Sequence, residues 1–413
     1  MKKTIKYIML AFAAVCAVAC EKWTEVEQAM PSDLISNTHG EDYYANLRAY
    51  RNSDHSIIMG YWQGWGGQTS SLRYSLMGLP DSVDLVSMWG MTPSAYPTLE
   101  LPEAMQADLK EAHEKKGIKC LMVFIAHSVG AQVTPSWVTS ASEENPVTVI
   151  DRYTGEKETC TNGTIAKRLF WGIDRSGSNN TAEQKDRWIK ATEAYADTLC
   201  HIIHSWDFDG FDWDLEIGYS VGDSGDFINN KDQTYAFCKR MREGLGDKIF
   251  IVDGTPEKLA APEACVFFDY FAFQAYNTVS GTGSFTHSSD TGLDQGVQLL
   301  INKYSPYLTT KFICEHTIML ESFEGSFQAN GNTYWGAANY TFRDGTRSNG
   351  TSTGIGTFEG MAMWNPVIDG VQYRKGGMGA YLLNYEYAPR FGNASATYPQ
   401  TRRAIQFMNP AVK

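Results

Sequence analysis

Eight short apolar runs recur along the chain, with helix-like stretches between several of them. The expected strands are Ser56–Gly60, Val83–Trp89, Ile118–Ala126, Phe208–Ile217, Lys248–Asp253, Phe268–Tyr276, Lys311–Glu315 and Gly377–Leu383. Helical spacing of apolar residues marks Glu103–Lys116, Thr181–Ile203, Lys231–Leu245 and Asp294–Lys303. The alternation predicts an α/β fold, a (β/α)₈ TIM barrel, whose active site lies at the carboxyl ends of the strands.

Two connections are too long to be simple turns. Residues 132–180 follow the third expected strand and residues 319–361 follow the seventh, so both loops should overhang the same mouth of the barrel. The second loop carries aromatic residues among Gly, Asn and Ser, namely Phe323, Phe327, Tyr334, Trp335, Tyr340 and Phe342. Such side chains either bind sugar faces or pack on the barrel, and the sequence leaves both readings open.

The most informative segment is Asp209–Glu216, which reads Asp-Gly-Phe-Asp-Trp-Asp-Leu-Glu. On a strand, alternate side chains share a face, so Asp212, Asp214 and Glu216 form an acidic row opposite an apolar one. Mutual repulsion should raise at least one pKa and leave a proton available for acid catalysis. A divalent-metal site or a purely structural network are weaker alternatives, because no calcium-loop spacing is present and burial of three acids is costly.

Composition and charge limit the kinds of partner that the protein can bind. The chain has 413 residues, 43% of them hydrophobic, and a formal net charge of −12, which disfavours nucleic acid and anionic membranes. Six cysteines after residue 20 lack a C-x-x-C pair, so buried free thiols are expected, with no metal and no cofactor. A monomer is expected.

The amino terminus has the order of a secretory signal: Lys2, Lys3 and Lys6, then an apolar run, then Cys20. Ala17-Val18-Ala19-Cys20 resembles a bacterial lipobox, which implies lipidation of Cys20; plain secretion with cleavage near Ala19 is the alternative. The expected organisation is a lipoprotein signal at 1–19, a tether and lead at 20–50, and the barrel at 51–413. Acidic residues after Cys20 resemble a surface-export signal, so an outer-membrane lipoprotein on the surface of a Gram-negative bacterium is expected, with the lipid as its only membrane contact.

The octapeptide matches the D-x-x-D-x-D-x-E signature of glycoside hydrolase family 18, which contains chitinases and endo-β-N-acetylglucosaminidases. The resemblance implies that Glu216 is the acid/base, that Asp214 orients the 2-acetamido group of the substrate, and that Asp212 is a buried supporting acid. Asp209 falls on the other face and is expected to be structural.

Two further strand ends carry the resemblance. Phe273-Gln274-Ala275-Tyr276-Asn277 is similar to the segment whose Tyr binds the acetamido oxygen, which implies roles for Gln274, Tyr276 and Asn277. Tyr381 stands where chitinases place a Trp, and the Gln-x-Tyr form resembles the endo-β-N-acetylglucosaminidase branch. The third-strand Ser-x-Gly-Gly pattern is absent, and His127-Ser128-Val129-Gly130 is its nearest counterpart.

Trp62, Trp65 and Trp89 lie near strand ends, where each could stack on a sugar or pack in the core; Trp62 and Trp89 are the candidate substrate contacts. The resemblance implies an endo-β-N-acetylglucosaminidase that cuts the GlcNAc-β1,4-GlcNAc core of N-glycans with retention, through an oxazolinium intermediate. A chitinase and a non-catalytic surface glycan-binding lipoprotein are the alternatives.

Overall fold

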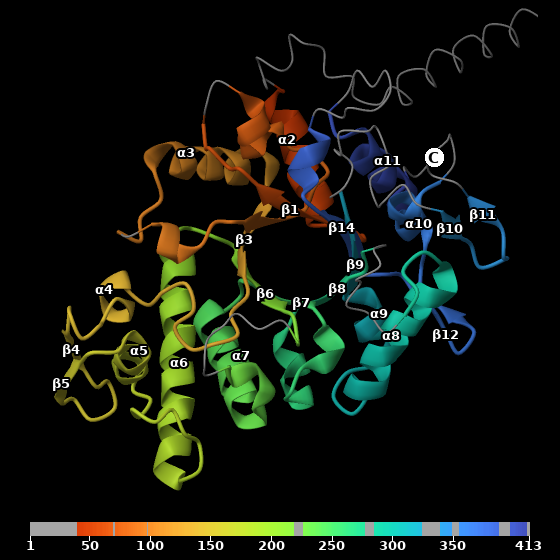
Figure 1. The fold of residues 1–413 in the computed structure, drawn as a ribbon. Coiled ribbons are helices and arrows are strands. Elements are labelled where there is room, and N and C mark those ends of the chain that lie inside the picture. Colours follow the sequence, from red (N-terminus) through yellow and green to blue (C-terminus); the bar gives the residue numbers. More distant parts are fainter. Residues whose placement is uncertain are drawn as a thin grey trace, which may run out of the picture.

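A closed barrel of eight parallel strands forms the centre of the molecule (Figure 1). The computed structural model describes residues 39–68, 71–96, 98–218, 226–276, 285–323, 339–348, 355–387 and 397–410. The barrel strands are β1 (Ile57–Gln63), β2 (Leu85–Trp89), β3 (Lys119–Phe124), β6 (Gly210–Leu215), β7 (Ile249–Gly254), β8 (Tyr270–Gln274), β9 (Thr317–Ser322) and β14 (Gly377–Tyr381). They pair in the order β1-β14-β9-β8-β7-β6-β3-β2, so the prediction of a TIM barrel is confirmed.

Helices surround this barrel (Figure 1). They are α2 (Glu41–Arg51), α3 (Glu103–Glu111), α4 (Ser136–Thr139), α5 (Gly163–Trp171), α6 (Ala182–Ser205), α7 (Lys231–Leu245), α8 (Asp290–Tyr304), α9 (Thr310–Glu315), α10 (Thr357–Met363) and α11 (Pro399–Met408). The longest, α6, begins with the expected capping box: Thr181 accepts from the Gln184 backbone N–H, and the Gln184 side chain accepts from the Thr181 backbone N–H. α2 occupies part of the segment expected as a lead, and its Arg48 donates to the carbonyls of Glu114 and Lys115.

The alternation of side chains along each strand separates two cores. Met59, Val123 and Ile251 belong to a small apolar cluster inside the barrel, whereas Phe211 and Trp213 belong to the large cluster between barrel and helices. Trp213 stacks on Phe227 with ring centroids 6.0 Å apart. The apolar face of the octapeptide therefore anchors β6 outward, which turns its acidic face into the barrel.

The prediction for the seventh strand was wrong in position. Residues 311–315 belong to the short helix α9, because Thr309 caps it by accepting from the Phe312 N–H at 3.1 Å. The barrel strand β9 follows two residues later and is buried throughout. A short apolar run such as Phe312-Ile313-Cys314 fits a buried strand or a buried helical turn equally well.

The long connection after β3 is a small structured unit at the side of the barrel (Figure 1). It contains α4, α5 and the antiparallel hairpin of β4 (Val147–Ile150) and β5 (Lys157–Cys160). Val138, Val149, Cys160 and Leu169 give it a core of its own. An ion pair from Asp151 to Arg187 on α6, at 3.0 Å, joins the unit to the barrel helices.

The connection after β9 is described only in part. It includes β10 (Tyr340–Thr341) and β11 (Arg347–Ser348), and a further hairpin of β12 (Val367–Ile368) and β13 (Val371–Gln372) follows α10. Phe323 and Tyr340 are buried, Phe342 packs beside them, and the Tyr340 hydroxyl donates to Asp290 at 2.7 Å. Packing on the barrel is therefore the role of these three aromatics; Phe327, Tyr334 and Trp335 lie outside the described residues.

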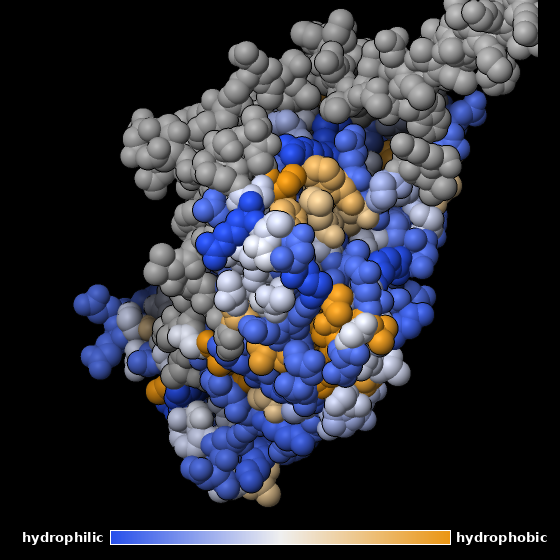
Figure 2. Space-filling model, turned by 90° about the vertical axis from the view of Figure 1, so that its right-hand side faces the viewer, coloured by the Kyte–Doolittle hydropathy of each residue, from blue (hydrophilic) through white to orange (hydrophobic). Residues whose placement is uncertain are grey.

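Several other expectations concern the surface and the amino terminus. The six cysteines, Cys120, Cys160, Cys200, Cys238, Cys265 and Cys314, are buried free thiols, as predicted. The side of the molecule that carries α8 and β12 is mostly hydrophilic, with apolar side chains in small separate patches (Figure 2). In the described ranges no helix is both long and apolar enough to span a bilayer. The signal segment and Cys20 lie outside the described residues.

Candidate functional site

The acidic row lies at the carboxyl end of β6, where it faces the barrel interior. Asp212 and Asp214 are fully buried on the strand, and Glu216 follows as the first residue after it and is partly exposed. The next strand contributes a fourth acid, because Asp253 on β7 is the register neighbour of Asp214. The site therefore contains three buried carboxyl groups beneath one that reaches the mouth.

Asp212 is held by a residue from β2, two strands away from β6 in the barrel. Ser87 on β2 donates its hydroxyl to Asp212 Oδ2 at 2.6 Å. Burial raises the pKa of Asp212 to about 6, although the hydroxyls of Ser87 and Tyr61 beside it act in the opposite direction. Asp212 thus titrates near neutral pH and can carry or share a proton with its neighbours.

Asp214 and Asp253 are bridged by one amide. The Gln274 Nε2 group on β8 donates to Asp214 Oδ1 at 3.1 Å and to Asp253 Oδ2 at 3.3 Å. Burial, then the charges of Asp253, Glu216 and Asp212, raise the pKa of Asp214 well above its usual range. Burial is also the main cause of the raised pKa of Asp253, followed by the charge of Asp212. The raised pKa values that the sequence predicted are confirmed, but desolvation contributes more than the repulsion on which that prediction relied.

The backbone after β6 is fixed so that Glu216 leaves the strand at the mouth. The Glu216 N–H donates to His127 Nε2 at 3.2 Å, and Thr255 donates its hydroxyl to the Leu215 carbonyl at 2.8 Å. Gly254 has φ +93°, and a Cβ there would lie 2.7 Å from the Leu215 oxygen, so glycine permits this close approach of β7. His127, which had no expected role, therefore positions the acid at the end of the row.

Aromatic side chains surround the acids at the mouth. The rings of Tyr276 and Tyr381 have centroids 5.9 Å apart, and Trp89 meets Tyr381 edge to face at 5.7 Å. Burial, followed by the charges of Asp253 and Asp214, raises the pKa of Tyr276 well above its usual value, so its hydroxyl stays protonated and can donate. The His287 Nδ1–H donates to the Tyr276 carbonyl at 2.8 Å and fixes this residue at the end of β8.

Some predicted site residues lie elsewhere. Trp62 is 1% exposed in the core between barrel and helices, and Trp65 donates to Asp108 at 2.7 Å in the same core. The structure therefore does not bring Trp62 to the site. Asn277 lies outside the described residues. Asp209 lies at the other end of β6, where it accepts from His113 Nε2 and the Cys120 N–H at 2.8 Å each, in keeping with the expected structural role.

Sequence reasoning missed Ser87, Tyr61 and Asp253. Ser87 and Asp253 lie on expected strands, and Tyr61 directly follows the expected strand Ser56–Gly60; all three are buried beside the acidic row. Asp253 had a usable signal, since a carboxylate at the carboxyl end of a barrel strand points to the active-site face. Ser87 and Tyr61 are small or aromatic residues within apolar runs, and no local pattern separates them from core residues.

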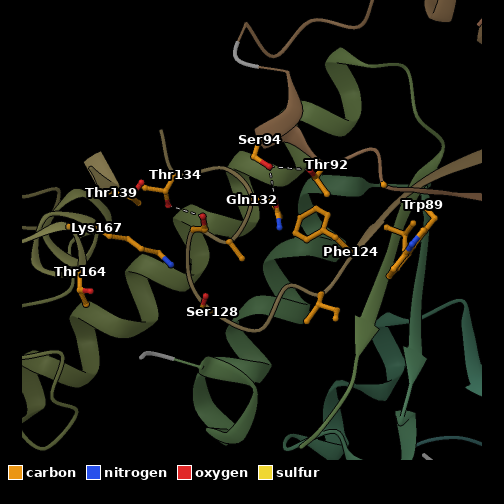
Figure 3. A pocket seen from close by; sticks show the side chains of 16 residues that line it. Trp89, Thr92, Ser94, Phe124, Ser128, Gln132, Thr134, Thr139, Thr164 and Lys167 are labelled. Atoms are coloured by element: carbon orange, nitrogen blue, oxygen red, sulfur yellow. Dashed lines mark hydrogen bonds between the residues drawn. The ribbon is translucent and has the colours of Figure 1, made fainter. Parts of the chain in front are cut away.

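A groove of about 650 Å³ is lined by residues from β2, from β3 and the segment after it, and from α5 (Figure 3). One wall is formed by Trp89 at the end of β2 and by Thr92 and Ser94 after it. The segment from Val123 to Thr134 forms the floor, and the outer wall consists of Thr139, Thr164 and Lys167. Val123 on the floor is the register neighbour of Asp212. The groove therefore begins beside the acids and runs toward the unit that follows β3.

Nothing within the described ranges forms a His, Cys, Asp and Glu cluster arranged to hold a metal ion. The partners of the buried acids are instead neutral donors, namely Ser87 for Asp212 and Gln274 for Asp214 and Asp253. Raised carboxyl pKa values suit proton transfer and hydrogen bonding.

Comparisons with known proteins agree with this geometry. The model of glycoside hydrolase family 18, BT1044-like, matches residues 25–151 and 147–407. A solved structure of a selenomethionine, glutamate-to-glutamine variant of BT1044 is 25% identical, with a TM-score of 0.64 over 91% of this chain and 94% of that one. The apo endo-beta-N-acetylglucosaminidase from Cordyceps militaris shares the fold at 18% identity, with a TM-score of 0.50 over 91% of this chain and 98% of that one.

A family 18 chitinase from Pseudoalteromonas aurantia is more distant, at 10% identity and a TM-score of 0.42 over 81% of this chain and 97% of that one. A search of curated proteins found no match. The family model covers most of the described barrel and includes the acidic row at the end of β6. The chain belongs to glycoside hydrolase family 18.

Proposed function

We propose that this protein is an endo-β-N-acetylglucosaminidase that hydrolyses the GlcNAc-β1,4-GlcNAc core of N-glycans with retention of configuration. The observation that carries the proposal is the hydrogen bond from Gln274 to Asp214. Gln274 stands two residues before Tyr276, at the mouth of the barrel where Glu216 leaves its strand. This Gln-x-Tyr arrangement is the form that resembles the endo-β-N-acetylglucosaminidase branch. The match to the BT1044-like family model supports it.

The geometry favours catalysis assisted by the substrate. Asp212, Asp214 and Glu216 project from one strand, and Asp253 lies on the neighbouring strand, so all four approach a bound sugar from one side. A carboxylate nucleophile would have to attack from the opposite side of the anomeric carbon, and family 18 is an exception to that two-carboxylate scheme. The 2-acetamido oxygen of the substrate then serves as the nucleophile.

The tasks in this scheme are divided among the site residues. Glu216 protonates the leaving glycosidic oxygen and later deprotonates the incoming water. Asp214 accepts a hydrogen bond from the acetamido N–H and stabilises the oxazolinium cation, and Tyr276 directs the acetamido carbonyl toward the anomeric carbon. Tyr381 and Trp89 offer apolar ring surface at the mouth for the sugar.

The test uses two kinds of substrate. The purified protein is incubated with an N-glycosylated protein and, separately, with chitin oligomers, and released sugars are followed by mass spectrometry. We expect a glycan ending in one GlcNAc from the glycoprotein, with the other GlcNAc left on asparagine. Cleavage of chitin oligomers alone would identify a chitinase, and binding without cleavage of either substrate would identify a glycan-binding protein.

The charge of Asp253 should influence the pH below which kcat/KM falls. The Asp253→Asn variant keeps an oxygen that can accept from Gln274 but removes a negative charge beside Asp214. Since the charge of Asp253 raises the pKa of Asp214, its removal lowers that pKa, and the active Asp214 carboxylate then persists to lower pH. We expect the acid limb of kcat/KM to shift to lower pH.

The exposed Asp232 on α7 supplies a matched control, Asp232→Asn, which should leave the pH profile unchanged. An acid limb that is identical in Asp253→Asn and the parent would refute the coupling. Asp212, Glu216, Tyr61 and Tyr276 also surround Asp214, so the shift reports one charge among several.

We also propose that the enzyme acts at the cell surface as a lipoprotein anchored through Cys20, which rests on the leader pattern alone. Brief protease treatment of intact cells checks this location. Removal of the protein without lysis is expected, and full protection would argue against surface exposure.

A further inference from the structure

We propose that the groove beside the acidic row is an extended subsite that holds one branch of the N-glycan, with Gln132 as a contact that determines specificity. The inference rests on the proposed function and adds to it where the glycan beyond the cleaved bond lies. The groove has about 650 Å³, within the range of about 300–1,000 Å³ common for small-molecule sites.

Two residues that line the groove lie next to residues of the catalytic site. The floor of the groove includes Val123, whose register neighbour on β6 is Asp212. Its near wall includes Trp89, whose ring meets Tyr381 at 5.7 Å. A glycan with its cleaved sugar at the acids can therefore extend into the groove without leaving the surface of the protein.

The chemistry of the lining suits a sugar branch. Hydroxyl and amide groups predominate among its polar side chains: Thr92, Ser94, Ser128, Gln132, Thr134, Thr139 and Thr164. Such groups can both donate to and accept from sugar hydroxyls, except that the Thr134 hydroxyl already donates to Gly130 and accepts from Trp171. Trp89 and Phe124 supply apolar ring surface. No Asp or Glu occurs among the described lining residues of this acidic protein, and the lining cation, Lys167, extends from α5 toward Ser128 and Thr134 (Figure 3). A branch with neutral sugars, with or without a terminal acidic sugar, therefore meets no repulsive charge in this lining.

Gln132 is oriented before any ligand arrives. Its φ of 62° lies in the left-handed region, which costs energy for a residue other than glycine and is common at functional positions. The Ser94 hydroxyl donates to Gln132 Oε1 at 2.5 Å, and Thr92 lies 3.1 Å from Ser94 (Figure 3). Because the amide oxygen is engaged, the NH₂ group is the part of the side chain left to donate to a ligand.

The outer wall is held firmly against the barrel. Gly130 has φ +79°, and a Cβ there would lie 2.1 Å from Trp171 Nε1, so this glycine lets α5 pack closely. Trp171 donates to Thr134 Oγ1 at 2.9 Å, and Asn162 caps α5 by accepting from the Thr164 N–H at 2.9 Å. A preformed groove of this kind binds with less loss of conformational freedom.

The experiment compares two glycoforms of one glycoprotein: branch-extended glycans, and the same glycans trimmed enzymatically to their core mannose units. The measured quantity is the ratio of kcat/KM for the extended glycan to kcat/KM for the trimmed one. Gln132→Ala should lower this ratio about 2- to 10-fold, the effect of one lost hydrogen bond. Thr164→Trp, which fills the groove from an exposed position on the first turn of α5, should lower it further.

Matched controls are Gln295→Ala on α8 and Thr148→Trp on β4, both at exposed positions away from the groove lining. Loss confined to the extended glycan in Gln132→Ala and Thr164→Trp supports the subsite. A ratio in Thr164→Trp equal to that in Thr148→Trp, with both glycoforms cleaved, overturns it. If the parent protein cleaves neither glycoform, the proposed function fails instead, so the two failures are distinguishable.

Discussion

Replacement of Glu216 by Gln is expected to lower kcat for release of the N-glycan by about 10²- to 10⁴-fold or more. The amide has the shape of the carboxyl group but cannot transfer a proton to the leaving glycosidic oxygen. Glu216 is partly exposed, and its backbone N–H donates to His127, a contact that the substitution retains. The loss should therefore fall on the chemical step and leave the fold intact.

The measurement is single-turnover release of glycan, followed by mass spectrometry, with glycan binding measured separately by calorimetry. Glu143→Gln, at an exposed position in the unit after β3, is the matched control and should keep the parent rate. An E216Q protein that hydrolyses as fast as the parent would refute the assignment of the acid/base. Retained binding by E216Q would show that ground-state contacts survive.

Replacement of Asp214 by Asn is expected to lower kcat by about 10²- to 10³-fold, the usual effect of removing one preorganised electrostatic contact to the transition state. Asp214 is buried and held by Gln274, so it is aligned before the substrate binds. An asparagine oxygen can still accept from the acetamido N–H, but it provides no negative charge for the oxazolinium cation. The defect should therefore appear in the step that forms the intermediate.

A premade sugar oxazoline separates the two roles. This compound enters after the step in which Asp214 is needed most, whereas its reaction with water still requires a general base. We expect D214N to consume the oxazoline at a rate much closer to the parent than its rate on the glycoprotein, and E216Q to consume it poorly. Equal defects of both variants on the oxazoline would contradict the division of labour.

The strand period is what made the acidic row predictable. Phe211, Trp213 and Leu215 alternate with the acids, and all three are buried in the core that faces the helices. Because side chains alternate along a strand, the only open question is which face of β6 points into the barrel. The apolar residues decide this, because they must pack against the larger core. The barrel followed from the same reasoning applied to eight runs.

The same alternation did not predict the orientation or the position of every strand. On β1, Tyr61 points into the barrel and Trp62 points to the outer core, although both are large aromatic side chains. A barrel strand is buried on both faces, so its sequence lacks the polar side that would set the phase. The displaced seventh strand has a similar cause, since α9 and β9 are both apolar and short.

The sequence by itself determined the family signature, the barrel and the direction in which Asp212, Asp214 and Glu216 face, because local alternation and one octapeptide encode them. Only the tertiary structure decided what surrounds these acids. Ser87, 125 positions from Asp212, and Gln274, 60 positions from Asp214, reach them through closure of the barrel, and the groove arises where β2, β3 and α5 meet. Burial of the acids, which raises their pKa values, likewise depends on contacts between distant strands rather than on residues beside them in the chain.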